Sequence, residues 1–139
     1  MTIKETEQQI VEEFSLFTEW LDKYEYLIEL GRSLPIINES GKEEKNLIKG
    51  CQSRVWLAAD YTDGKIYFTA DSDAIITKGI VSLLVRVFSG RTPQEIIDAD
   101  LSFIKEIGLE ENLSPTRANG LLSMIRQIKF YAVAFAANK

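Results

Sequence analysis

An Asp63-Gly64 dipeptide separates two segments rich in β-branched and aromatic residues, and it constrains the fold more than any other local feature. Asp-Gly is favoured in the two-residue turn of a β-hairpin, which requires positive φ angles. The flanking segments, 54–61 and 65–70, are therefore predicted to pair as antiparallel strands. A shorter segment, 46–49, predicts a third strand that ends at Gly50-Cys51. The sequence thus predicts a small three-stranded antiparallel sheet, with Cys51 at the connection between two strands.

Helical patterns flank this sheet on both sides in the sequence. The first thirty residues place apolar side chains at three- and four-residue steps, and a break near residues 15–18 would divide them into two helices. Because the strands are adjacent in sequence and do not alternate with helices, we predict an α+β fold with N- and C-terminal helices, in one domain spanning 1–139. The downstream helices are predicted at 74–88, from 93 to 98, at 101–107 and from 115 to about 137.

Charge and hydropathy restrict the class of partner. The net charge of -5 argues against a broad nucleic-acid surface. No apolar stretch reaches the ~20 residues that a membrane span needs, and the N-terminus has no apolar signal core. We therefore expect a cytoplasmic protein with neither a nucleic acid nor a membrane as its partner.

The charged residues are distributed unevenly along the chain. Residues 1–30 hold eight acids and two lysines, whereas residues 112–139 hold four cations and no acid. Two helices that attract each other would explain this pattern, and so would two faces that meet different partners. A third interpretation is that both are simply solvated helix faces.

Cys51 is the single cysteine, and the chain has no histidine. An internal disulfide, a metal site built on the usual Cys and His ligands and a Cys-His nucleophilic pair are therefore all excluded. A lone cysteine is often an inert, buried side chain, but here its neighbours Lys49, Gln52, Ser53 and Arg54 are polar or charged. What one thiol can do alone is accept, carry or exchange a group covalently.

Four segments resemble the SufE family of sulfur-acceptor proteins. They occur in the family's order and at its spacing, and the resemblance extends from about residue 15 to 130. The segments are Gly50–Trp56 (GCQSRVW), Ala70–Gly79 (ADSDAIITKG), Thr92–Ile96 (TPQEI) and Leu113–Gly120 (LSPTRANG).

The resemblance implies a fold shared with the IscU-type scaffolds and a role as partner of a SufS- or CsdA-like cysteine desulfurase. That desulfurase uses pyridoxal phosphate, whereas this chain is expected to bind no cofactor and no metal directly. Cys51 would accept persulfide sulfur, stimulate the desulfurase and pass the sulfur to a SufBCD-like iron–sulfur scaffold complex. The chain would then be a persulfide carrier rather than a free-standing enzyme. The resemblance leaves open the choice between the SufE and CsdE branches and the formation of a homodimer.

Four further residues are candidates for supporting Cys51 or contacting the partner. Asp73 is either a helix N-cap, together with Asp71 and Ser72, or part of the desulfurase interface. Arg117 lies in the first turn of the last predicted helix, where a cation is unfavourable, which suggests a salt bridge, a partner contact or proximity to Cys51. Arg54, like Lys49, could increase the thiolate fraction of Cys51. Gln52, which directly follows Cys51, is the fourth candidate.

Two other functions remain open from the residues alone. Cys51 could belong to a thiol redox enzyme or sensor, although no second cysteine is present to resolve an oxidised thiol. It could also be inert in an adaptor of the desulfurase. If Cys51 carries sulfur, Gly50 suggests a mobile loop tip that shelters the sulfur against apolar residues between encounters.

Overall fold

The computed structural model describes residues 1–51 and 53–137, and its sheet is the predicted hairpin. Strand β1 (Val55–Thr62) pairs antiparallel with β2 (Lys65–Ser72), in a register that runs from Val55 opposite Ser72 to Thr62 opposite Lys65. Asp63 and Gly64 form the turn with φ angles of 52° and 79°, as the primed hairpin turns require. The hairpin and the α+β class are therefore confirmed.

The predicted third strand is wrong. Within the described residues, the sheet has two strands, and segment 46–49 contributes one isolated bridge between Leu47 and Trp56. The Ile48 amide donates a hydrogen bond of 2.8 Å to the Val55 carbonyl. The segment is too short to extend this pairing, because the 3-10 turn η2 (Glu44–Asn46) precedes it and Gly50, with a φ of 91°, follows it.

The helices follow the predicted order, and the predicted break in the first thirty residues is present. One difference is that the segment predicted as one helix at 101–107 is a shorter helix, followed by a further turn of helix after Gly108. No helix in the described part of the chain combines the length and apolar character needed to cross a membrane. The helices are α1 (Ile3–Phe14), α2 (Trp20–Gly31), α3 (Ile75–Phe88), α4 (Pro93–Asp98), α5 (Ser102–Glu106), α6 (Leu109–Asn112) and α7 (Pro115–Ala137), and a second 3-10 turn, η1, spans Glu39–Gly41.

Helix α3 is buried over most of its length, but the N-cap prediction is wrong. Its N-cap residue is Ala74, which has no side-chain capping bond. The Ser72 hydroxyl accepts a hydrogen bond from the Ala74 amide at 3.2 Å, while Asp73 bonds elsewhere. The capping box at the start of α4 is present, with Thr92 and Glu95 each accepting from the other's backbone amide.

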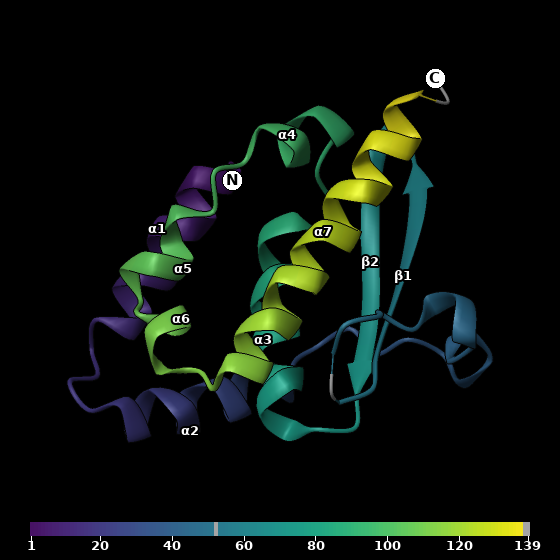
Figure 1. The fold of residues 1–139 in the computed structure, drawn as a ribbon. Helices are drawn as coiled ribbons and strands as arrows, with labels where there is room; N and C mark the ends of the chain where they lie inside the picture. The colour runs from purple at the N-terminus through teal and green to yellow at the C-terminus, as the bar shows by residue number, and fades with distance from the viewer. Residues whose placement is uncertain (52, 138–139) are drawn as a thin grey trace.

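Helix α7 runs alongside the two strands, and its N-terminal end lies at the same end of the hairpin as the start of β1 (Figure 1). Its C-terminal half packs on the sheet, where Phe135 stacks on Tyr61 with ring centroids 5.0 Å apart. Helix α7 packs mainly against α4 and α3, whereas the acidic α1 packs mainly against α3 and α5. The opposite charges at the two ends of the chain therefore do not reflect a direct packing of α1 against α7.

Candidate functional site

The thiol of Cys51 lies against the N-terminal part of α7. Cys51 is half-buried, and its Sγ donates a weak hydrogen bond to the Gly120 carbonyl over 3.6 Å. A Cβ added at Gly120 would lie 3.4 Å from this sulfur. Gly120 is therefore within van der Waals range of the thiol, at the point where the Cys51 loop meets α7.

Gly50 sets the conformation of the chain as it approaches the thiol. Its φ of 91° is unfavourable for any residue with a side chain. A Cβ added at Gly50 would also lie only 2.5 Å from the Ser123 hydroxyl. Gly50 thus lies against Ser123, and Cys51 lies against Gly120 one turn earlier in α7. The loop is therefore held close to the helix.

A cavity of about 300 Å³ opens beside Cys51. The cavity joins the Cys51 loop, the first turns of α3 and the start of α7, and its wall combines hydroxyl groups and a guanidinium with apolar side chains. A small polar group attached to the sulfur can therefore contact the polar side of the cavity, while the apolar side excludes water. Its lining residues are Cys51, Ser53, Thr77, Ile80, Ser114, Thr116, Arg117, Gly120 and Met124.

Burial raises the pKa of the Cys51 thiol. The thiol is therefore predominantly protonated at neutral pH, and a protonated thiol is a poor nucleophile. In this half-buried position, Cys51 is therefore held in its protonated, unreactive form. Any change that exposes Cys51 to water or brings a cation closer would increase its thiolate fraction.

Proximity to Cys51 was one of the three explanations offered for Arg117, and the two residues line the same cavity. The backbone amide of Arg117 donates to the Ser114 hydroxyl at 3.3 Å, which caps the first turn of α7. Its side chain is exposed and forms no salt bridge with the residues that the structure describes. The guanidinium is therefore available to an anionic group in the cavity.

Asp73 and Arg54 hold the chain just after the Cys51 loop. The Arg54 amide donates to Asp73 Oδ1 at 3.0 Å, and the Asp73 amide donates to the Arg54 carbonyl at 3.2 Å. This reciprocal pair fixes the start of β1, next to Ser53 in the cavity wall. The Arg54 side chain is exposed, and neither Arg54 nor Asp73 lines the cavity. Gln52, the remaining predicted residue, lies outside the described residues.

Several cavity residues were not among the predicted site residues. Thr77 and Gly120 stand inside two of the matching segments, so their positions offered a signal, but only the fold shows that both face the thiol. Met124 carries no such signal because it reads as an ordinary apolar residue of a helix. Within residues 1–51 and 53–137, the His, Cys, Asp and Glu side chains form no group of three or more that could hold a metal ion.

Comparisons with known proteins identify the family of this chain. The family model SufE, described as an Fe-S metabolism associated domain, matches residues 8–132. An uncharacterized SufE-like protein of Rhizobium meliloti (strain 1021) is 44% identical over 126 residues, which cover 87% of this chain and 90% of that protein. An uncharacterized SufE-like protein of Synechocystis sp. (strain ATCC 27184 / PCC 6803 / Kazusa) is 39% identical over 127 residues, 91% of this chain and 80% of that protein.

A solved structure supports the fold. The solution structure of a hypothetical protein from Thermus thermophilus superimposes with a TM-score of 0.76 at 22% identity, covering 93% of this chain and 94% of that one. At this identity the likeness concerns the fold alone. The family match over residues 8–132 and the two relatives above 30% identity show that this chain belongs to the SufE family, whose domain is associated with iron–sulfur metabolism.

Proposed function

We propose that this protein accepts persulfide sulfur from a cysteine desulfurase on Cys51 and relays it to iron–sulfur cluster assembly. The observation that carries the proposal is the placement of Cys51. The single thiol of the chain stands half-buried at the wall of a cavity of about 300 Å³ that also contains Arg117. Membership of a family associated with iron–sulfur metabolism supplies the class of pathway.

The transfer is a thiolate–persulfide exchange that needs no oxidant. The Cys51 thiolate attacks the outer sulfur of the persulfide on the desulfurase, and a new S–S bond forms as the old one breaks. The desulfurase cysteine leaves as a thiolate, and Cys51 now carries the extra sulfur. A second exchange of the same kind moves that sulfur to the next acceptor and restores the Cys51 thiol.

The closed position of Cys51 suits a carrier between its two encounters. Because burial raises the pKa of the thiol, the unloaded carrier reacts slowly with oxidants and small thiols. A partner that moves the Gly50-Cys51 segment away from α7 would hydrate the thiol and thereby lower its pKa. In this proposal, reactivity is conferred by docking rather than by a resident general base.

Arg117 is the residue that we assign to the loaded state. A persulfide is a stronger acid than a thiol, so its terminal sulfur is negative at neutral pH and would be stabilised by a nearby cation. The exposed guanidinium at the cavity wall can supply that charge. Asp73 acts indirectly, through its hydrogen bond of 3.0 Å to the Arg54 amide at the start of β1.

The partners follow from this chemistry. The donor is a SufS- or CsdA-like desulfurase, whose own pyridoxal phosphate releases sulfur from cysteine, and this chain binds no cofactor of its own. The receiver is a SufBCD-like scaffold complex. With a single cysteine and no histidine, this chain supplies too few of the usual ligands to hold a cluster alone. By removing the persulfide, the protein would also stimulate turnover of the desulfurase.

Desulfurase turnover separates this proposal from its alternatives. Steady-state alanine production from cysteine should rise when the wild-type protein is added, and it should remain at the basal rate with Cys51→Ser. If Cys51→Ser stimulates as well as the wild type, the protein is an adaptor with an inert cysteine. If neither protein stimulates and peroxide oxidises Cys51 rapidly, the thiol is a redox sensor.

A further inference from the structure

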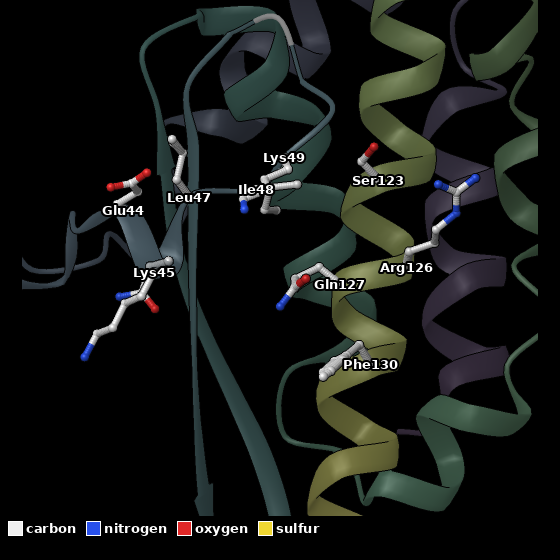
Figure 2. A pocket seen from close by; sticks show the side chains of 10 residues that line it. Glu44, Lys45, Leu47, Ile48, Lys49, Ser123, Arg126, Gln127 and Phe130 are labelled. Atoms are coloured by element: carbon white, nitrogen blue, oxygen red, sulfur yellow. The ribbon is translucent and has the colours of Figure 1, made fainter.

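A groove of about 680 Å³ lies beside α7, and it is larger than the Cys51 cavity. We call it the α7 groove. One wall is the segment 44–49, and the other is one side of α7, contributed by Ser123, Arg126, Gln127 and Phe130. Figure 2 shows Gln127 and Phe130 pointing from α7 toward the segment 44–49, whereas Arg126 and Lys45, at the outer edges of the groove, point away from each other.

Apolar side chains extend this groove along the outside of α7. Phe130 and Val133 are each 57% exposed, and Leu122 is 43% exposed. Together with Arg126 they are spaced by three or four residues, so they share one face of the helix. A second, more apolar hollow of about 350 Å³ adjoins Phe130 and is lined by Lys129, Phe130, Val133 and Ala134. Exposed apolar side chains gathered in this way characterise protein-binding surfaces.

The charge of the α7 groove is opposite to that of the molecule. Among the described residues that line it, Lys45, Lys49 and Arg126 are cationic and Glu44 is anionic, whereas the whole chain carries -5. Lys45 Nζ lies 3.6 Å from Glu43 Oε2, but both side chains are exposed, so water screens the pair and the charge of Lys45 remains available to a partner.

Helix α7 carries the same sign of charge along its whole length. Its sequence from Pro115 to Ala137 has three cations and no acid. One of these, Lys129, donates to the carbonyls of Ile96, Ile97 and Ala99, where it stabilises the end of α4. Arg126 has no such structural partner among the described residues, so its charge is available at the rim of the groove.

We propose that the α7 groove binds an acidic segment of a partner protein that inserts one large apolar side chain against Phe130. The apolar centre and the cationic rim complement such a segment, in the arrangement common to protein interfaces. Electrostatic attraction to Lys45, Lys49 and Arg126 would fix its orientation. This surface is separate from the cavity that holds the Cys51 thiol, because the two share none of their lining residues.

The α7 groove nevertheless adjoins the carrier loop. Ser123, in the groove wall, is the residue that a Cβ on Gly50 would strike, and Lys49 lies in the opposite wall. A segment seated in the groove therefore lies beside the chain that leads into Cys51 from its N-terminal side. The inference concerns binding only, and it can fail without affecting sulfur acceptance at Cys51.

Amide-resolved NMR titration with synthetic peptides tests the proposal. The probe is a short peptide in which aspartates and glutamates flank one central phenylalanine, and the comparison peptide replaces the acids by glutamines. The acidic peptide should shift the amides of 44–49 and 123–130 saturably and bind at least about tenfold more tightly than the glutamine peptide. Higher salt should weaken the acidic peptide selectively.

Matched variants locate the binding surface. Lys45→Glu/Arg126→Glu and Phe130→Ala should each weaken the acidic peptide by about tenfold or more. The controls are Lys65→Glu/Lys105→Glu, which changes an equal charge elsewhere, and Leu21→Ala, which removes an apolar side chain that is 68% exposed against 57% for Phe130. Both controls should leave affinity unchanged. Shifts confined to another surface, or equal losses in the controls, would overturn the proposal.

Self-association would also overturn the proposal. If sedimentation shows a dimer that Phe130→Ala dissociates, and the acidic peptide does not compete with it, then the occupant of the groove is a second copy of this chain. A monomer whose groove amides respond to the acidic peptide supports the proposal.

Discussion

Among single residues, Gly50 determines how closely the thiol approaches α7. Gly50→Ala should lower the free energy of unfolding by about 2 kcal/mol, because an alanine there has a strained φ and its Cβ would meet Ser123. The loop should relieve the strain by moving away from the helix. Cys51 should then react faster with a water-soluble disulfide reagent, as thiol-labelling rates would reveal.

Two matched variants separate strain from collision in this prediction. Gly64 has a φ of 79°, but a Cβ added there would meet nothing within 4 Å, so Gly64→Ala reports the backbone strain alone. The double variant Gly50→Ala/Ser123→Ala removes the colliding hydroxyl without adding a glycine to α7, and it should recover part of the loss. Equal destabilisation in Gly50→Ala and Gly64→Ala, with unchanged labelling of Cys51, would contradict the close packing described here.

Ionisation of the Glu7 carboxyl opposes folding. Its side chain on α1 is 6% exposed, and its Oε2 has no hydrogen-bond partner among the described residues. Burial raises the pKa of this carboxyl, an effect that the backbone of Phe103 partly offsets. A raised pKa in the folded state means that the contribution of Glu7 to stability is complete below the ordinary value of 4.5 and is lost as the pH rises through the folded value.

Replacing this carboxyl by a neutral amide should therefore stabilise the protein at neutral pH. Glu7→Gln should increase the free energy of unfolding at pH 7 by about 1 kcal/mol, the lower end of the cost of a buried unsatisfied polar group. The gain should disappear near pH 4. Urea unfolding at the two pH values measures this difference, and an equal effect at both would show that ionisation of Glu7 is not responsible.

At the scale of elements, the packing of α2 against α3 depends on two glycines. A Cβ added at Gly79 would lie 2.2 Å from the carbonyl oxygen of Leu27, whereas one added at Gly31 would lie 3.1 Å from the nitrogen of Gly79. Gly79→Ala should therefore destabilise the protein by about 3 kcal/mol or more, despite the better helix propensity of alanine. Gly31→Ala should cost less, about 1 kcal/mol. Denaturant unfolding would establish the order, and a reversed order would contradict this packing.

Local signals predicted the elements well wherever a few adjacent residues determine them. Asp63-Gly64 fixed the hairpin, and Thr92-Pro93 with Glu95 fixed the start of α4. The segment 46–49 misled because apolar character suggests a strand, whereas pairing also requires length, and a 3-10 turn and a positive-φ glycine leave room for one bridge. Asp73 misled because its position suits an N-cap, yet its carboxylate bonds to a residue nineteen positions earlier.

At the scale of the whole molecule, the site depends on contacts that no short segment encodes. Cys51 and Gly120 are 69 residues apart in sequence, yet their hydrogen bond joins the loop to α7. The sequence singled out Cys51 as the only thiol and Arg117 by its unfavourable place in the first turn of a helix, but only the fold shows that they share one cavity. The exposed apolar face of α7 was likewise hidden, because apolar residues occur all round this helix and the sequence does not show which of them meet the core.

The location of sulfur after a single desulfurase turnover tests the central claim most directly. The protein is mixed with a cysteine desulfurase, pyridoxal phosphate and sulfur-labelled cysteine, alkylated and mapped by non-reducing peptide mass analysis. We predict one reductant-sensitive labelled sulfur on the peptide that contains Cys51, and none on the corresponding peptide of Cys51→Ser. If the desulfurase becomes labelled while Cys51 of the wild-type protein never does, this protein is not a sulfur acceptor.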